Sequence, residues 1–238
     1  NVMTYRLVVK EVAIKNNVYA TFMPKPIFGE NGSGMHTHQS LFKGDKNAFF
    51  DPNDPNHLSD IAKSYMAGIL HYAREITLVT NQWVNSYKRL VPGYEAPVYI
   101  SWAVRNRSDL VRVPMYKPGH EKATRMEYRS PDPACNPYLA FAVMLAAGLE
   151  GIEKGYKLRE AVEGNIYEMT EEERAKEGIE TLPESLGEAI NVTEKSDLVR
   201  KTLGDHIFYK LIENKKIEWK NHRIRVTSQE IEDYLPIL

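Results

Sequence analysis

Residues 31–40 read Asn-Gly-Ser-Gly-Met-His-Thr-His-Gln-Ser, a glycine-rich turn followed by alternating side chains. The alternation predicts a strand over residues 35–42, and residues two apart in a strand share a face. His36, His38 and Ser40 are therefore expected to point the same way. A neutral imidazole is a good ligand for a divalent metal, and the glycines leave backbone N–H groups open to a ligand. The alternative is a surface hairpin whose histidines face solvent, since short motifs often occur by chance.

A second strand-like stretch, residues 124–130, carries charge on one face. Arg125, Glu127 and Arg129 share that face, and the two residues between them face the core. A carboxylate between two guanidiniums stays ionised, so it can bind a metal while the arginines hold phosphate or carboxylate. The alternative is a ladder of salt bridges on a solvated sheet face.

Two loops add further charged groups. Glu95 lies in a loop between Gly93 and Pro97, and loops of this kind often display functional groups. The stretch 105–108 reads Arg-Asn-Arg-Ser. Six cations fall within about forty residues and indicate a polyphosphate site, with a solvated basic face as the alternative; they are Arg89, Arg107, Arg112, Lys122, Arg125 and Arg129.

The overall composition excludes several classes of protein. The 238 residues include 31 Lys and Arg against 32 Asp and Glu, a net charge of −1. This balance argues against a nucleic acid or an anionic membrane as the main partner. The single cysteine, Cys135, excludes a disulfide scaffold and a multi-cysteine zinc module. The best apolar run, residues 138–149, is shorter than the roughly 20 residues that a membrane span needs.

Hydrophobic periodicity predicts the order of the elements. Strands are expected at 18–23, 35–42, 48–50, 98–104, 110–115 and 124–130, and helices at 4–15, 58–79, 137–154 and from 183 to 235, with an acidic loop region after residue 160. Strands dominate before residue 130 and helices after it. The pattern indicates an α+β fold with a largely antiparallel sheet flanked by helices and a helical C-terminal third.

Together these motifs closely resemble the glutamine synthetase family. Residues 25–40 are similar to its ATP-binding signature, residues 89–97 to its glutamate flap, and residues 105–108 and 125–132 to its other hallmarks. The resemblance implies one partial catalytic domain of a prokaryotic type I enzyme over residues 1–238. Its sheet-rich active-site part would be 1–135 and its mainly helical part 136–238. The chain opens within a helical pattern and without Met, so we expect an internal start that leaves out the family's N-terminal β-grasp domain and its further metal-binding glutamates.

The resemblance also implies a role for each motif residue. Glutamate would be bound by Asn31, Gly32, Arg89, Glu95, Arg107 and Arg129. ATP would be bound by His38, Ser40, Arg107, Arg112, Lys122 and Arg125, and a Mg²⁺ or Mn²⁺ ion by His36 and Glu127. Glu95 and Arg107 would be the catalytic residues: Glu95 shields the intermediate and accepts a proton from ammonium, and Arg107 bridges substrate and phosphate.

The implied activity is ATP-dependent ligation of ammonia to L-glutamate, giving L-glutamine, ADP and phosphate through γ-glutamyl phosphate. Two alternatives are a γ-glutamyl ligase that uses a larger amine and a non-catalytic structural or regulatory relative. The family further implies a cytoplasmic homo-oligomer in nitrogen metabolism, a dodecamer of two hexameric rings, with a nitrogen-regulatory protein as a partner. Tyr167 falls where some relatives carry an adenylylated tyrosine. Its surroundings lack the proline-rich continuation of those sites, so we expect it to be unmodified.

Overall fold

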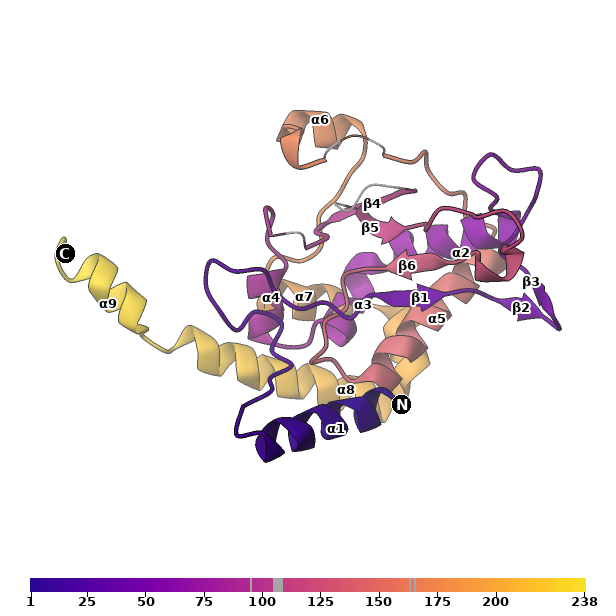
Figure 1. The fold of residues 1–238 in the computed structure, drawn as a ribbon. Helices are drawn as coiled ribbons and strands as arrows, with labels where there is room; N and C mark the ends of the chain where they lie inside the picture. Colours follow the sequence, from indigo (N-terminus) through magenta and orange to yellow (C-terminus); the bar gives the residue numbers. More distant parts are fainter. Residues whose placement is uncertain (95, 105–108, 163, 165) are drawn as a thin grey trace.

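A four-stranded sheet in the order β1-β6-β5-β4 lies at the centre of the molecule (Figure 1). The computed structural model describes residues 1–94, 96–104, 109–162, 164 and 166–238. The strands are β1 (Thr37–Gln39), β6 (Met126–Tyr128), β5 (Asp109–Arg112) and β4 (Tyr99–Ala103). β6 is antiparallel to both β1 and β5, whereas β5 and β4 are parallel. The predicted α+β fold with a largely antiparallel sheet is confirmed.

The register of the sheet separates a charged face from an apolar one. His38 of β1 and Arg112 of β5 both lie opposite Glu127 of β6. Because side chains alternate along a strand, these three share a face. Met126 and Tyr128 are fully buried on the other face, as their positions in the sequence predicted.

Helices cover the apolar face. α2 (Asp60–His71) begins at Ser59, whose hydroxyl accepts a hydrogen bond from the Ala62 amide. α5 (Pro137–Glu153) begins at Asn136, which caps the helix ahead of a proline at its first position, as predicted. The two helices approach closely, because a Cβ on Gly68 would lie 2.2 Å from the Ala147 carbonyl oxygen.

The single helix predicted over 58–79 is wrong, because the structure has two helices there. It divides at Tyr72 into α2 and α3 (Ala73–Thr80). The Tyr72 ring contacts His71 edge-on at 4.6 Å and packs with Tyr156 at 6.4 Å between centroids. Apolar spacing continues through the break, so periodicity alone reads one helix.

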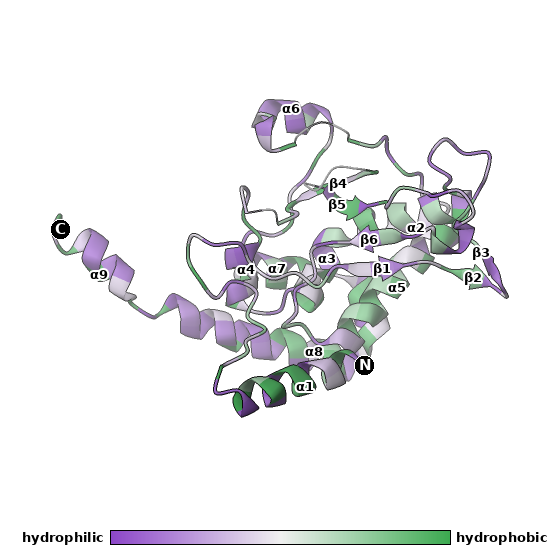
Figure 2. Cartoon of the chain, viewed as in Figure 1, coloured by the Kyte–Doolittle hydropathy of each residue, from purple (hydrophilic) through white to green (hydrophobic). Residues whose placement is uncertain are grey.

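The C-terminal third is helical but not continuous. It contains α7 (Leu186–Thr193), α8 (Asp197–Arg223) and α9 (Ser228–Tyr234), and α8 is kinked at Gly204, where φ is +73°. The end of α8 and α9 extend away from the body (Figure 1). Figure 2 shows apolar residues along α1 (Val2–Lys15), which has no buried residue.

Three predicted strands need correction. Residues 18–23 form no strand: Tyr19 is 89% exposed, and no strand of the described chain pairs with this stretch. The strand predicted over 35–42 divides into β1 and β2 (Phe42–Lys43). The return strand is β3 (Lys46–Asn47), earlier than the predicted 48–50, because the chain turns tightly at Gly44, where φ is +58°.

Several short elements were not predicted. The acidic region contains η2 (Ile166–Glu168) and α6 (Glu171–Lys176), whose start is fixed by a reciprocal pair of hydrogen bonds between Thr170 and Glu173. α4 (Val84–Arg89) precedes the Glu95 loop, and η1 (Glu121–Ala123) precedes β6. No helix in the described ranges has both the length and the apolar character needed to cross a membrane.

Candidate functional site

The centre of the candidate site is the carboxylate of Glu127 on the charged face of the sheet. Its Oε1 lies 2.9 Å from Nδ1 of His36, and its Oε2 accepts a 2.6 Å hydrogen bond from Nε of Arg112. Only 4% of the Glu127 side chain is exposed, against 36% for His36. The carboxylate therefore lies beneath two basic groups and is not part of a solvated ladder.

The charges of these groups follow from their surroundings. Burial by itself would raise the pKa of Glu127, but the nearby Arg112 and His36 outweigh it and hold the pKa below its usual value. Burial, followed by the charge of Arg129, lowers the pKa of His36. At neutral pH the site thus presents an ionised carboxylate and a neutral imidazole.

His38 lies next to this pair. Its Nδ1 accepts a 3.0 Å hydrogen bond from Nε of Arg125, and burial followed by the charges of Arg125 and Arg112 lowers its pKa, although Glu127 opposes the change. His38 and Ser40 both line a cavity of about 410 Å³, which continues over apolar residues of α2 and α5: Tyr65, Phe141, Met144 and Leu145. A polar rim beside an apolar floor is typical of a site for a small organic ligand.

Arg89, at the end of α4, is buried behind the glycine-rich loop. Its Nη1 and Nη2 donate to the carbonyl oxygens of Ser130 (2.6 Å) and Arg129 (3.1 Å). Burial lowers the pKa of Arg89 to about 10, so it stays charged. A Cβ on Gly32 would lie 2.9 Å from Cγ of Arg89, and one on Gly34 would lie 2.5 Å from its Nη2. A Cβ on Gly32 would also lie 2.4 Å from the Pro24 carbonyl oxygen, so these two glycines let the loop pack closely against both the arginine and its own backbone.

The remaining predicted site residues are placed as follows. Arg129 is 5% exposed, and its Nη1 donates to the Asp109 carbonyl oxygen at 3.2 Å. Asn31 is exposed in the glycine-rich loop, and Lys122 is exposed on η1. The side chains of His36, His38, Arg112, Arg125 and Glu127 come together, whereas no contact joins Lys122 to them in the described chain. The predictions for Glu95 and Arg107 fall outside the described residues.

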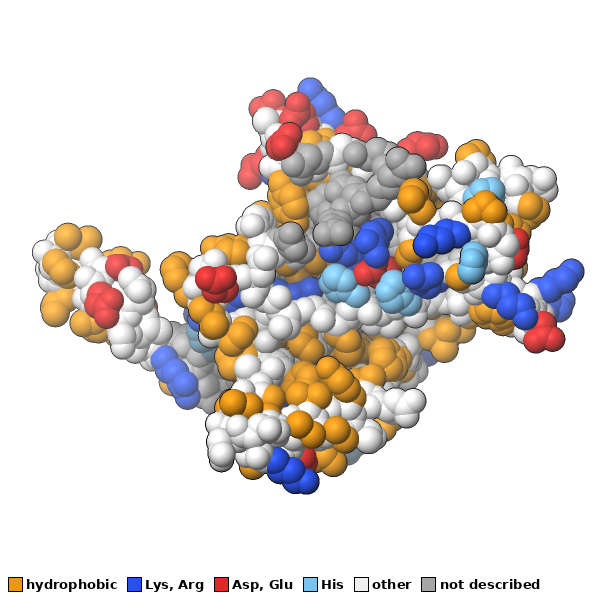
Figure 3. All heavy atoms as spheres, viewed as in Figure 1, with side chains coloured by type: hydrophobic (Ala, Val, Ile, Leu, Met, Phe, Trp, Pro, Cys, Tyr) orange, Lys and Arg blue, Asp and Glu red, His pale blue; other side chains and the backbone are white. Residues whose placement is uncertain are grey.

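Figure 3 shows this arrangement on the surface. Histidine, Lys and Arg side chains gather around an acidic group over β1 and β6. This cluster lies on the face of the sheet opposite the one that α2 and α5 cover.

Comparisons with known proteins identify the family. The model of the glutamine synthetase catalytic domain matches residues 1–234. The chain belongs to this family. It is 57% identical over 237 residues to a glutamine synthetase of Mycolicibacterium smegmatis and 54% identical over 235 residues to one of Thermotoga maritima. These alignments include 100% and 99% of this chain but 53% of each relative, so the chain spans about half the length of the curated relatives it matches.

Solved structures of the glutamine synthetase type share the fold. One, described as "GmaS/ADP complex-Conformation 1", is 33% identical, with a TM-score of 0.88 over 99% of this chain and 53% of that one. Another, "Apo GmaS without ligand", is 32% identical, with a TM-score of 0.82 over 98% of this chain and 52% of that one. The likeness extends over nearly the whole chain.

Glutamine synthetases generally depend on ATP and a divalent metal, and the donor set here fits such a metal in part. A neutral imidazole and an ionised carboxylate, both on the charged sheet face, are suitable ligands. In the described part of the chain, no three His, Cys, Asp or Glu side chains are grouped closely enough to hold a metal. An ion at His36 and Glu127 would therefore take its other ligands from outside this group.

Two contacts that the sequence did not predict involve Tyr94 and Ala96, the described neighbours of position 95. Nζ of Lys25 lies 3.7 Å from the centroid of the Tyr94 ring. The hydroxyl of Tyr167 donates a 2.9 Å hydrogen bond to the Ala96 carbonyl oxygen. Lys25 lies in the motif that resembles the family's ATP-binding signature, so the sequence could have indicated that Lys25 belongs to the site. No local sequence pattern predicted the Tyr167 contact.

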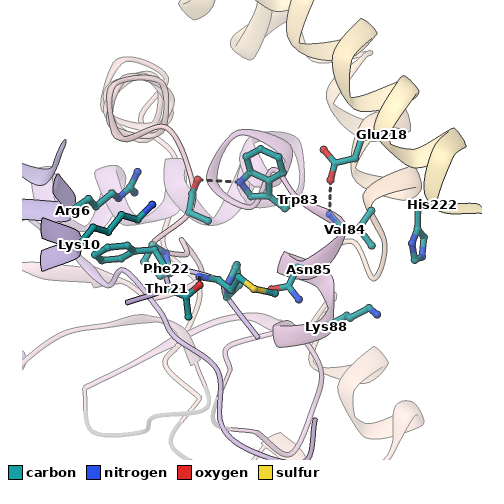
Figure 4. A pocket seen from close by; sticks show the side chains of 14 residues that line it. Arg6, Lys10, Thr21, Phe22, Trp83, Val84, Asn85, Lys88, Glu218 and His222 are labelled. Atoms are coloured by element: carbon teal, nitrogen blue, oxygen red, sulfur yellow. Dashed lines mark hydrogen bonds between the residues drawn. The ribbon is translucent and has the colours of Figure 1, made fainter. Parts of the chain in front are cut away.

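A separate cavity of about 540 Å³ lies near α1, α4 and α8 (Figure 4). Its walls combine the cations Arg6, Lys10 and Lys88 with the rings of Phe22 and Trp83. None of the predicted site residues lines it. We therefore place the candidate reaction on the charged sheet face.

Proposed function

We propose that the protein containing this chain ligates ammonia to L-glutamate at the expense of ATP. The observation that carries the proposal is the cluster of His36, Glu127 and Arg112 on one sheet face, in a chain 57% identical to a curated glutamine synthetase. The cavity at the edge strand β1, beside His38 and Ser40, supports a nucleotide next to this cluster. A structural neighbour described as an ADP complex supports it too.

The first step transfers a phosphoryl group. An oxygen of the substrate's γ-carboxylate attacks the γ-phosphorus of ATP, the bond to the ADP oxygen breaks, and γ-glutamyl phosphate forms. Arg112, with Arg107 and Arg125, would stabilise the charge on the transferred group, because guanidiniums match phosphate oxygens in a planar fork. His36 and Glu127 would hold Mg²⁺ or Mn²⁺, which when bound supplies charge neutralisation at the phosphates.

The second step forms the amide. Ammonium loses a proton to Glu95, and the free ammonia attacks the γ-carbonyl carbon. The bond from that carbon to the phosphate oxygen then breaks, and the nitrogen loses a second proton to the departing phosphate, which gives the amide and inorganic phosphate. Asn31, Gly32, Arg89 and Arg129 would bind the substrate glutamate. Arg89 and Arg129 are held by backbone carbonyls, so their guanidiniums are already oriented before a substrate arrives.

We also propose an assembly in the cytoplasm, a dodecamer of two hexameric rings, with a nitrogen-regulatory protein as a partner. Support for an assembly comes from apolar side chains that the described chain leaves exposed on α1, on α9 and on the residues that follow α9. They include Leu7, Val8, Val12, Ile231, Leu235 and Ile237.

The decisive experiment is an assay of the full-length protein with glutamate, ATP and Mg²⁺ or Mn²⁺. Ammonia, methylamine and a larger amine are compared, and ADP and amide product are both measured. Glutamine formation at one ADP per amide, fastest with ammonia, supports the proposal. Preference for the larger amine would favour the sister ligase, and binding without turnover would favour a non-catalytic relative.

A further inference from the structure

The loop around residue 95 is held differently on its two sides. On the N-terminal side, Pro92 and Gly93 are exposed, Tyr94 is half-exposed, and Gly93 adopts a φ of +92°. On the C-terminal side, the chain is buried from Ala96 through Ile100. The two sides therefore differ in how firmly packing alone can fix them.

The C-terminal side is joined to the segment that includes η2 and α6. The Tyr167 hydroxyl donates to the Ala96 carbonyl oxygen, and its ring meets Tyr99 edge-on at 5.7 Å. Further along, the Leu182 amide donates to the Val98 carbonyl oxygen at 2.8 Å. The segment of residues 166–182 is therefore a brace behind this side of the loop.

On the N-terminal side, Tyr94 contacts Lys25, whose ammonium group also donates to the Glu30 carbonyl oxygen. The Lys25 ammonium group lies 3.7 Å from the centroid of the Tyr94 ring, and only 9% of the residue is exposed. The Lys25 backbone is itself fixed, because its amide and carbonyl both bond to the side chain of Asn85 at 2.9 Å. A desolvated cation over an aromatic face is a favourable contact.

We propose that Lys25 and Tyr167 are positioning residues that hold the two sides of the Glu95 loop. Lys25 begins the loop that carries Asn31 and Gly32, so its contact with Tyr94 joins the predicted glutamate-binding loop to the Glu95 loop. Tyr167 contacts the C-terminal side through Ala96 and Tyr99. The role in turnover rests on the proposed function; the two contacts themselves do not.

The two residues should therefore have different kinetic signatures. Loss of the Lys25 contact should raise KM for glutamate several-fold and lower the amount of glutamine formed per ATP cleaved. Loss of the Tyr167 hydroxyl should leave that KM unchanged and lower kcat. One hydrogen bond of about 1 kcal/mol corresponds to roughly a fivefold effect.

The test uses the full-length protein with Lys25→Met, Lys25→Arg and Tyr167→Phe. A matched pair of controls is Lys154→Met and Tyr156→Phe, since Lys154 also lies over a tyrosine ring, at 5.9 Å, on the C-terminal end of α5. Amide hydrogen exchange over residues 93–99 is measured together with ADP and glutamine. We expect faster exchange in Lys25→Met and Tyr167→Phe, near-normal behaviour in Lys25→Arg, and wild-type behaviour in both controls.

Two results would overturn the inference. One is wild-type exchange in the loop of both variants; the other is faster exchange with unchanged KM, kcat and coupling. A wild-type protein that makes no glutamine is a different result and refutes the proposed function. Exchange in the loop then still shows whether Lys25 and Tyr167 hold it.

Discussion

Nδ1 of His36 lies 2.9 Å from Oε1 of Glu127, although the two residues are 91 positions apart in the chain. The contact arises because β1 and β6 are neighbours, with His38 directly opposite Glu127. The second carboxylate oxygen is held by Arg112 from β5. Three adjacent segments of the sheet thus orient one buried carboxylate, which is the kind of preorganisation that a binding site needs.

Replacing His36 with alanine should weaken metal–nucleotide binding much more than it lowers stability. His36 is partly exposed, and Arg112 still neutralises Glu127 in the variant. We expect at least about tenfold weaker binding of Mn²⁺–ADP, judged by the effects of altering metal-site residues. Titration calorimetry and thermal melting of the full-length protein measure the two quantities. His206→Ala, on the exposed surface of α8, is the control, and unchanged Mn²⁺–ADP affinity in His36→Ala would refute the ligand assignment.

Replacing Arg112 with lysine tests the phosphate role. Lysine keeps the charge but loses the planar fork of the guanidinium. We expect kcat to fall by about tenfold or more, on the scale of lost transition-state hydrogen bonds, with little change in Tm. Arg200→Lys, in the surface pair with Asp205, should behave as wild type. An unchanged kcat in Arg112→Lys would refute the phosphate role and leave the cluster with a structural role.

Local patterns predicted which side chains share a face, but not which strands are neighbours. Alternation placed His36 with His38 and Arg125 with Glu127, because the period of two is a property of one strand. The pairing of β1 with β6 depends on contacts between distant parts of the chain. The resemblance to a known family, not the alternation, suggested that His36 and Glu127 serve one site.

The errors have identifiable physical causes. The break at Tyr72 leaves the apolar spacing intact, so the spacing predicted one helix. The burial of Arg89, on which the sequence made no prediction, depends on the carbonyls of residues 129 and 130. Neither can be read from neighbouring residues. In contrast, α6 was predictable, because Thr170 and Glu173 have the spacing of a capping box.

Replacing Gly68 with alanine should destabilise the contact between α2 and α5. The added Cβ would lie 2.2 Å from the Ala147 carbonyl oxygen and 2.9 Å from Cα of Gly151. Both are backbone atoms of α5, so relieving the clash would require the two helices to move apart. We expect a loss of about 1–3 kcal/mol, the range for overpacked cores. Chemical denaturation measures it. Gly164→Ala is the control because its Cβ would meet no atom of the described residues within 4 Å, and equal stability of both variants would contradict the packing argument.

Asp54 should stabilise the protein in a pH-dependent way. Burial opposes ionisation, but the ion pair with Lys63 and the amides of Leu58 and Asn56, at 3.1 and 3.0 Å, lower the pKa of Asp54 from its usual 3.8. A depressed folded-state pKa gives stability that is present above the unfolded value and is lost as pH falls through the folded value.

Asp54→Ala should therefore lose about 1–2 kcal/mol at pH 7, the scale of such hydrogen bonds. Its difference from wild type should shrink once the pH falls below 3.8. Denaturation curves at several pH values measure this, with Asp45→Ala in the exposed β2–β3 turn as the control. A difference that stays constant down to acid pH would show that the charge of Asp54 is not responsible.

Replacing Glu95 with alanine tests the flap itself. γ-Glutamyl phosphate reacts with water as well as with ammonia, so a loop that shields this intermediate protects it from hydrolysis. A carboxylate there would attract ammonium and take its proton, which leaves the nucleophilic amine beside the acyl phosphate. Both functions act after ATP has been cleaved. In full-length Glu95→Ala we therefore expect glutamine formation to fall more than ADP release, so the ratio of glutamine to ADP drops below one.

Glu232→Ala on the exposed surface of α9 is the control, with normal coupling. A Glu95→Ala variant with the wild-type rate and ratio would leave the loop as an ordinary surface turn, and a parallel fall of both products would place Glu95 in the first step.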